Sequence, residues 1–297
     1  MNPFAGKTFR LLLSLSWLAA ASLSAQERAV DPTWLHRFLP TVADMKADLS
    51  SATCHVHTVF GPGDQDSRIL RSVSHFSEVI IDPHGSCESV RYEREEEIYF
   101  VSQGTGLLQL ADETHPLRAG DFTYFAPGLK HGVSNNSSSP LRVLVMAFKI
   151  PARIALSASP PQPKIINLDA VKEQPVQGHP TSVLYKLMVG PRKATRDAID
   201  DAYVVTSLFW MDFAPGGTNF PHHHETAEEI YLVMDGEGQM VAGSGMDGIE
   251  ARFPAKAGDA YYFRPNCTVG FYNKETPGAK AHILAVRSRI PLSNEED

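Results

Sequence analysis

Two histidines and one glutamate with the spacing of metal ligands stand close together in the second half of this 297-residue chain. His222 and His224 are separated by one residue, and Glu229 follows a short polar turn at the start of the apolar run E-I-Y-L-V-M. Residues two apart in a strand point to the same face, so the two imidazoles share one side. Two imidazoles and a carboxylate from adjacent strands suit a divalent metal, with positions left open for water or substrate.

The elements that must position these residues are short β-strands. In residues 53–151 and again in residues 182–292, β-rich runs alternate with Gly, Pro, Asp and Asn. Many short strands with frequent turn signals predict an all-β sandwich or barrel in each stretch. The proline-rich residues 152–181 between them indicate a linker. Asp31-Pro32 has the pattern of a helix start, so we expect a helical N-terminal extension over residues 26–52.

The two β-rich stretches are copies of one another. E-E-I-Y-F-V-S-Q-G-T-G at 96–106 matches E-E-I-Y-L-V-M-D-G-E-G at 228–238. Likewise, A-G-D-F-T-Y-F-A-P at 119–127 matches A-G-D-A-Y-Y-F-R-P at 257–265. The repeat is much longer than the unit of a solenoid, so it indicates a tandem duplication of a whole domain.

These motifs resemble the cupin superfamily, and specifically the bicupins. The first motif of that family, G-x5-H-x-H-x3/4-E-x6-G, is matched fully in the second copy by Gly216, His222, His224, Glu229 and Gly236. The resemblance implies two tandem, jelly-roll-like β-barrels and a metal held by His222, His224 and Glu229. The seven-residue spacing to Gly236 favours Glu229 over Glu228 as the ligand.

The second motif of the family, which supplies a fourth ligand, is broken in this copy. Val269 stands where the ligand histidine would be, and a valine cannot bind a metal. We therefore expect, as the preferred alternative, a metal site with three protein ligands. A substitute fourth ligand is the alternative, with His282 on the following strand as a candidate and Tyr262 and Cys267 as weaker ones.

The N-terminal copy departs from the family pattern in the opposite way. Arg91 and Glu93 occupy the two histidine positions, whereas Glu97 and His131 match the family's metal ligands. Arg91 would bring a fixed positive charge that neutralises Glu93 or Glu97. Arg91, Glu93, Glu97 and His131 form a secondary, weak candidate site, in which Glu93, Glu97 and His131 could hold a hard cation or a zinc ion. We expect instead that this barrel holds no metal and serves as a structural half or as an anion pocket around Arg91. Residues 94–96 are expected to form a solvated turn.

The resemblance implies one divalent metal ion, and the ligand set accommodates Mn, Fe, Co, Ni, Cu or Zn. Such an ion can polarise a carbonyl or activate water or dioxygen. We expect a metal-dependent enzyme of the dioxygenase, hydrolase or isomerase type, acting on a small oxygenated or carboxylated molecule. The sequence indicates no catalytic residue beyond the metal ligands. The alternatives are a non-catalytic protein that binds a sugar acid or another anion, and a structural bicupin.

The first residues indicate export. In residues 1–25 a basic head precedes an apolar core and small residues that suit cleavage near Ser24 or Ala25. No run reaches the roughly 18 apolar residues that indicate a membrane helix. We expect a signal peptide that is removed, a periplasmic or extracellular protein with no membrane contact afterwards, and a frayed tail at residues 293–297.

The net charge narrows the classes of binding partner. The cysteine content leaves one disulfide pairing open. A formal net charge of −7 without a basic stripe argues against nucleic acid as a partner, which leaves a small molecule. The resemblance also makes a homodimer possible, because cupin barrels often associate through their sheet edges. Cys54 and Cys87 lie in the same half and form a candidate pair, while Cys267 makes the count odd.

Overall fold

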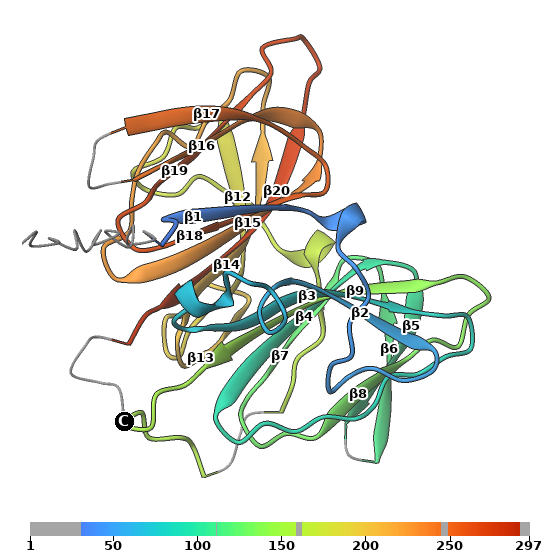
Figure 1. Ribbon diagram of the computed structural model, residues 1–297. Helices are drawn as coiled ribbons and strands as arrows, with labels where there is room; N and C mark the ends of the chain where they lie inside the picture. The colour runs from blue at the N-terminus through green and yellow to red at the C-terminus, as the bar shows by residue number, and fades with distance from the viewer. Residues whose placement is uncertain (1–30, 111, 159–161, 245–248, 292–297) are drawn as a thin grey trace, which may run out of the picture. The chain divides into compact units, whose positions relative to one another are not determined.

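Strand-forming alternation dominates the chain, and the predicted all-β class is confirmed (Figure 1). The computed structural model describes residues 31–110, 112–158, 162–244 and 249–291. The predicted signal peptide, residues 26–30 of the predicted extension and the tail lie outside these ranges. The described part contains twenty strands and three short 3-10 turns, η1 (Leu39–Thr41), η2 (Ser67–Ile69) and η3 (Leu168–Ala170). No helix in it is long and apolar enough to cross a membrane.

The N-terminal barrel consists of a six-stranded sheet that faces a three-stranded one. The large sheet has the order β10-β7-β4-β9-β3-β2 and the small one the order β6-β5-β8. The strands are β2 (Cys54–Phe60), β3 (Val73–Ile81), β4 (Glu95–Gln103), β5 (Thr105–Leu110), β6 (Glu113–Arg118), β7 (Asp121–Phe125), β8 (His131–Ser134), β9 (Leu141–Lys149) and β10 (Ile166–Asn167).

The C-terminal barrel repeats this plan. Its large sheet has the order β1-β18-β15-β20-β14-β12-β11, with β13 paired to β12, and its small sheet the order β17-β16-β19. The strands are β1 (Trp34–Phe38), β11 (Glu173–Gln174), β12 (Val183–Pro191), β13 (Ile199–Ala202), β14 (Val205–Phe213), β15 (Ala227–Asp235), β16 (Glu237–Ser244), β17 (Ile249–Lys256), β18 (Asp259–Phe263), β19 (Thr268–Asn273) and β20 (Ala281–Arg289).

The predicted helical extension is wrong for the described residues, because the segment after Pro32 forms β1. This strand runs antiparallel to β18, with Trp34 opposite Phe263 and Phe38 opposite Asp259. Leu35 is buried, and the Trp34 ring lies 4.8 Å from that of Phe253. Pairing with the open edge of a distant sheet therefore outweighs the local helix signal. The linker also contributes strands, since β10 pairs with β7 and β11 with β12.

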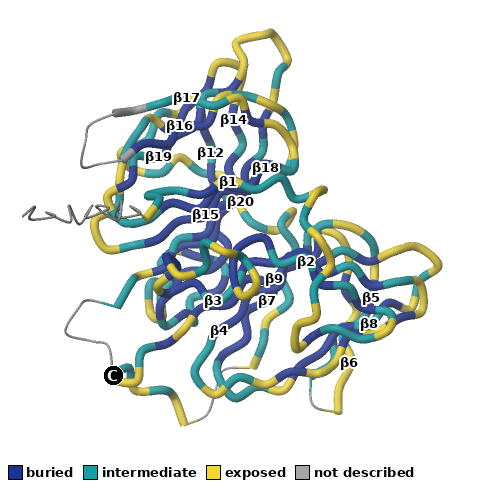
Figure 2. Tube along the Cα trace, in the orientation of Figure 1, coloured by how far each residue is buried: buried dark blue, intermediate teal, exposed yellow. Residues whose placement is uncertain are grey.

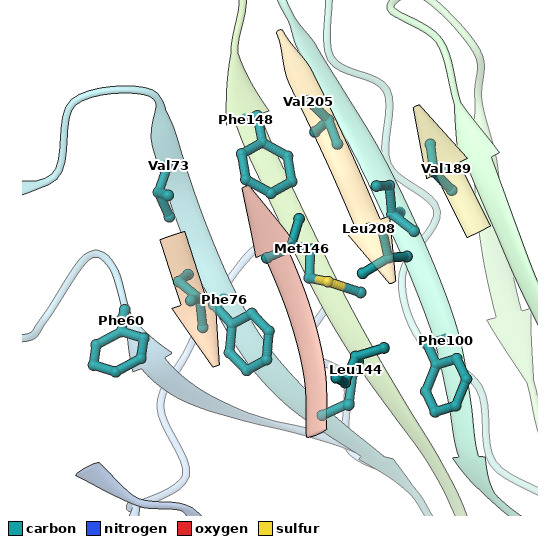
Figure 3. Packing of buried hydrophobic residues seen from close by; sticks show 14 of the residues in the cluster. Phe60, Val73, Phe76, Phe100, Leu144, Met146, Phe148, Val189, Val205 and Leu208 are labelled. Atoms are coloured by element: carbon teal, nitrogen blue, oxygen red, sulfur yellow. The ribbon is translucent and has the colours of Figure 1, made fainter. Parts of the chain in front are cut away.

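Alternation along the two matching strands β4 and β15 separates two kinds of core. On β15, Tyr231 and Val233 lie in the interior of their barrel, whereas Ile230 and Leu232 belong to a cluster that spans both barrels. β4 divides its residues in the same way. Figure 2 shows the resulting bands of buried strand, and Figure 3 shows the shared cluster, with Phe148 and Met146 of one barrel near Val205 and Leu208 of the other. The two large sheets therefore pack back to back through apolar side chains.

A fully buried glutamate of each barrel reaches across the interface and bonds to the backbone of the other barrel. Glu96 accepts hydrogen bonds from the backbone N–H groups of Tyr203, Val204 and Val205 at 2.6–2.9 Å, and from the Tyr124 hydroxyl at 2.8 Å. The predicted solvated turn is therefore wrong at Glu96, which is 0% exposed. Burial raises the pKa of Glu96, and the four donors oppose that rise.

Glu228 makes the reciprocal contact. It accepts from the backbone N–H groups of Arg71, Ser72 and Val73 and from the hydroxyl groups of Ser72 and Tyr262, at 2.5–3.1 Å. Alternation explains why Glu96 and Glu228 lie in the interface while their neighbours Glu97 and Glu229 point into the barrels. Each carboxylate accepts hydrogen bonds from buried backbone N–H groups that would otherwise be unpaired.

We expect Glu96→Ala to lower the free energy of unfolding by about 3–5 kcal/mol, because it leaves three backbone N–H groups and the Tyr124 hydroxyl without their acceptor. Glu228→Ala should have an effect of similar size. Urea denaturation measures both. The matched control is Glu113→Ala, whose side chain is 80% exposed and which should change stability by no more than about 0.5 kcal/mol. Equal effects at Glu96 and Glu113 would contradict this account.

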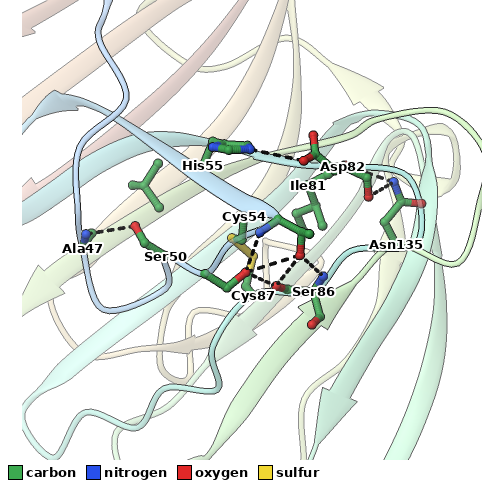
Figure 4. Close-up of a disulfide and its surroundings, with 12 residues drawn as sticks. Ala47, Ser50, Cys54, His55, Ile81, Asp82, Ser86, Cys87 and Asn135 are labelled. Carbon is green, nitrogen blue, oxygen red and sulfur yellow. Dashed lines mark hydrogen bonds and ion pairs between the residues drawn. A yellow bond between two sulfur atoms is a disulfide. The ribbon is translucent and has the colours of Figure 1, made fainter.

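The candidate cysteine pair forms a disulfide. Cys54 at the start of β2 is bonded to Cys87, 33 residues later, and both side chains are buried (Figure 4). The bond ties β2 to the loop that follows β3. Cys267 is free and buried, with its thiol directed at the Gly243 carbonyl oxygen.

Removal of the disulfide should destabilise the N-terminal barrel. We expect a Cys54→Ser/Cys87→Ser variant to lose about 3 kcal/mol, because the open chain regains the freedom that closing this loop removes. Thiol labelling of the unfolded wild-type protein checks the bond directly. One thiol should react without reductant and three after reduction. Three reactive thiols without reductant would contradict the pairing.

Candidate metal centre

The three predicted ligands converge at the mouth of the C-terminal barrel. Glu229 lies on β15 with its side chain inside, on the face that also carries Tyr231. His222 forms an isolated antiparallel bridge with Val269 of β19, and the two residues exchange backbone hydrogen bonds of 2.9 and 2.8 Å. One donor atom from each of His222, His224 and Glu229 lies within 4.8 Å of the others. The valine at the missing-ligand position thus sits beside the cluster.

The local backbone orients His222. Phe220 has a φ of +54°, in the left-handed region that is unfavourable for a bulky residue, and it is followed by Pro221. Its carbonyl oxygen accepts a hydrogen bond of 2.8 Å from His222 Nδ1. This bond fixes the proton on Nδ1 and leaves the lone pair of Nε2 for a metal. Phe220 therefore positions the carbonyl oxygen that orients His222, one of the predicted ligands.

The donor set fits a divalent cation. Glu229 is 2% exposed, and no described residue donates a well-aligned hydrogen bond to either of its carboxylate oxygens. Its Oε2 lies 3.2 Å from His224 Nε2. A buried carboxylate whose nearest donor is a single imidazole is costly, and a bound cation would reduce that cost.

The charge states of the cluster also suit metal binding. Burial opposes ionisation of Glu229, yet His224, Arg287 and His222 together hold the pKa of this carboxyl below its ordinary value. Burial lowers the pKa of His222, which favours the neutral imidazole. An ionised carboxylate and a neutral imidazole are the forms that bind a metal.

Two arginines and a tyrosine extend the site into a small cavity of about 50 Å³. Arg287 lies opposite Glu229 in the β15–β20 register, and its Nη1 is 3.1 Å from His224 Nε2. Arg287 and Arg196 both donate to Ser207 Oγ, at 3.2 and 2.8 Å. The Tyr185 hydroxyl is buried without a hydrogen-bond partner among the described residues, and burial raises its pKa so that it keeps its proton. The cavity therefore offers cations and one hydroxyl donor.

The structure does not bring the predicted substitute ligand into this cluster. Along β20, Ile283 and Ala285 point into the barrel, so His282 faces the other way. Its ring nitrogens lie 3.5 and 3.6 Å from carboxylate oxygens of Asp212 and Asp235.

The weaker candidates are also engaged elsewhere. Tyr262 donates to Glu228 between the barrels. Burial raises the pKa of Cys267 above its ordinary value and so favours the thiol over the thiolate that metals bind.

The four residues of the secondary site in the N-terminal barrel form two separate pairs. Arg91 and Glu93 have side chains that are 57% and 70% exposed, and they pair with each other at 2.8 Å. Glu97 and His131 are buried, and His131 Nε2 lies 2.9 Å from Glu97 Oε2. The ring of His131 is stacked on that of Phe125 at 3.8 Å. The predicted neutralisation of Glu93 by Arg91 is present, but it lies at the surface.

Sequence reasoning missed Arg287, Arg196 and Tyr185. The sequence does hold one sign of Arg287, which is the only charged residue in the otherwise apolar run I-L-A-V-R. The matching position in the N-terminal barrel, opposite Glu97, is Ala147. Arg196 and Tyr185 lie on segments that the family motifs do not cover. Their place at the cavity follows only from the sheet order, which joins β12 and β14 to β20.

Comparison with known proteins agrees with this architecture. The model of the Cupin domain family matches residues 77–147 and 209–286, one region in each barrel and together half of the chain. A solved structure of protein Ylba from E. coli superposes with a TM-score of 0.64 at 14% identity, covering 89% of this chain and 95% of that one. The oxalate decarboxylase of Lactobacillus farciminis, in a formate complex, gives a TM-score of 0.61 at 11% identity, covering 87% and 86%.

A curated relative is similar over one segment only. "Uncharacterized protein MJ1618" of Methanocaldococcus jannaschii is 34% identical over 53 residues, which is 18% of this chain and 42% of that protein's length. The predicted fold of two tandem cupin barrels is confirmed by the family match in both regions and by the superpositions.

Proposed function

Because this chain belongs to the Cupin domain family, we propose that it is an exported, metal-dependent enzyme that acts on a small carboxylated molecule in its C-terminal barrel. One observation carries the proposal. Glu229 is buried at the cavity, its nearest donor is the His224 imidazole at 3.2 Å, and two histidines lie within metal-ligand distance. A buried anion of this kind needs a cation partner.

His222, His224 and Glu229 would hold the metal. When bound, a divalent ion would supply Lewis acidity or activate water or dioxygen, and its identity would decide between dioxygenase, hydrolase and isomerase chemistry. The backbone carbonyl of Phe220 holds His222 in the tautomer that exposes Nε2. Tyr231, a cavity residue itself, receives a hydrogen bond at its hydroxyl from Asn219 Nδ2, which keeps the neighbouring wall in place.

Arg287 and Arg196 on the cavity wall support a carboxylate as the bound group, with Arg287 the main cation because Arg196 also pairs with Asp197 at 2.8 Å. Arg287 and Arg196 share Ser207, so one hydroxyl holds two guanidinium groups at the same wall. Arginine is suited to bidentate contact with a carboxylate. The Tyr185 hydroxyl would donate to a second oxygen of the same molecule. A cavity of about 50 Å³ favours a molecule of few atoms, and the similar L. farciminis structure is a formate complex.

Export is supported by the Cys54–Cys87 disulfide, since such bonds persist mainly in oxidising compartments. The signal-like composition of residues 1–25 points the same way. An anion pocket around Arg91, the basis of the non-catalytic alternative, has less support, because Arg91 pairs with Glu93 at the surface.

We expect the purified protein to contain about one equivalent of a divalent metal, and a His222→Ala/His224→Ala variant to contain almost none, because it keeps one ligand of three. Elemental analysis of protein isolated from its own compartment measures this content. His223→Ala is the matched control, since His223 lies between the two ligands and is exposed. Equal, near-zero metal in the wild type and the double variant would refute the proposed site.

Arg287→Ala should weaken the binding of small carboxylates to the metal-loaded protein about 10- to 100-fold, because a charge-assisted hydrogen bond in the cavity is lost. Calorimetric titration with formate, glyoxylate and oxalate measures the affinities. Arg91→Ala serves as the control and should leave them unchanged. If loss of Arg91 weakens binding and loss of Arg287 does not, the binding site lies in the N-terminal barrel instead.

A further inference from the structure

A third histidine, which no cupin motif covers, stands at the same cavity. His179 comes from the proline-rich linker, just before β12, and lines the cavity together with His222 and Glu229. Its ring centroid lies 5.1 Å from that of His222, in an edge-on arrangement with an interplanar angle of 75°. The two predicted ligands His222 and His224 are related in nearly the same way, at 5.0 Å and 78°. His179 thus repeats the geometry of a ligand pair.

This spacing is compatible with two imidazoles bound to one ion. With a metal–nitrogen distance of about 2.1 Å, ring centroids on ligands at right or tetrahedral angles are roughly 4.5–5.3 Å apart. Both ring separations fall in that range. Edge-on pairs roughly 4.5–7 Å apart are also ordinary packing of aromatic rings, so this geometry permits shared ligation without requiring it.

The hydrogen bonding of His179 presents the correct nitrogen. Its Nδ1 lies 2.9 Å from the carbonyl oxygen of Asn219, which can only accept. The proton therefore sits on Nδ1, and the lone pair on Nε2. His222 uses the same arrangement with the Phe220 carbonyl. Asn219 is itself held rigid, because its side chain bonds to Phe271 N and the Tyr231 hydroxyl at 2.8 and 2.9 Å.

We propose that His179 is the fourth protein ligand of the metal and replaces the histidine that Val269 has lost. This proposal rests on the metal site described above. The compact set of His222, His224 and Glu229 does not include His179, so ligation requires its half-buried side chain to move inward when the ion binds. The turn that carries it is closed by the His179 N–H to Val176 carbonyl bond of 3.1 Å. The ring contacts Tyr185 and His222 at centroid separations of 5.4 and 5.1 Å, so these neighbours must accommodate the shift.

The consequence is a site of three imidazoles and one carboxylate, assembled from the linker, from the loop between β14 and β15, and from β15. Three nitrogen ligands and one oxygen ligand suit the later first-row divalent metals. The metal would also fix the segment that joins the two barrels, because it would pull residues 176–180 onto the mouth of the second barrel.

The test compares His179→Ala with the wild type in metal affinity and in the number of bound imidazoles. Competition with a chelator gives the Zn²⁺ affinity, which we expect to fall at least about 10-fold. Pulsed electron paramagnetic resonance of the Cu²⁺-loaded protein counts imidazole ligands. We expect three in the wild type and two in the variant. Urea denaturation of the apo-proteins confirms that the variant folds.

Two further variants keep the possible outcomes apart. His223→Ala should change neither readout, and His282→Ala tests the other substitute ligand. An unchanged imidazole count in His179→Ala overturns the proposal even if the affinity falls, because His179 would then act only through its neighbours. A lower count in His282→Ala instead would assign the fourth position to His282. If the wild type binds no Zn²⁺ or Cu²⁺ at all, the proposed metal site itself fails.

Discussion

Two buried carboxylates hold the backbone of this molecule together across its two halves. Glu96 and Glu228 occupy the same position in the two copies. Each accepts hydrogen bonds from three consecutive backbone N–H groups of the other barrel. Charges in such a dry interface are tolerated only when their hydrogen bonds are complete. The apolar packing between the large sheets could accept small shifts in position, but these directional bonds cannot. They therefore set the register in which the barrels meet.

That register decides which glutamate faces the candidate metal site, because side chains alternate with a period of two along a strand. Once Glu228 is directed into the interface, Glu229 must point into the barrel, where it meets the histidines. In the first copy, the same alternation directs Glu97 into the barrel. Of the residues at the family's ligand positions there, Glu97 contacts only His131. Duplication thus kept the interface glutamate in both halves, while the interior surroundings of the second glutamate diverged. Structural and functional roles have separated on neighbouring residues.

Local patterns predicted what depends on local spacing. His222, His224 and Glu229 stand within eight residues, so a sequence motif is sufficient to identify them. Arg287 and His179 reach the same cavity from β20 and from the linker, and only the order of strands in the sheet brings them there. The helix predicted around β1 is wrong for the same reason, because the partner strand β18 begins more than two hundred residues later.

The placement of β1 has a consequence for how the chain becomes a finished protein. His36 contacts Asp259, 223 residues further on, so the first described strand can pair with β18 only after the residues between them have been made. A polypeptide that emerges from a ribosome or a translocation channel must keep this strand waiting until almost the whole sequence has passed. Until then one edge of the second barrel is open to pairing with other chains. A product truncated before β18 would leave β1 without its partner strand.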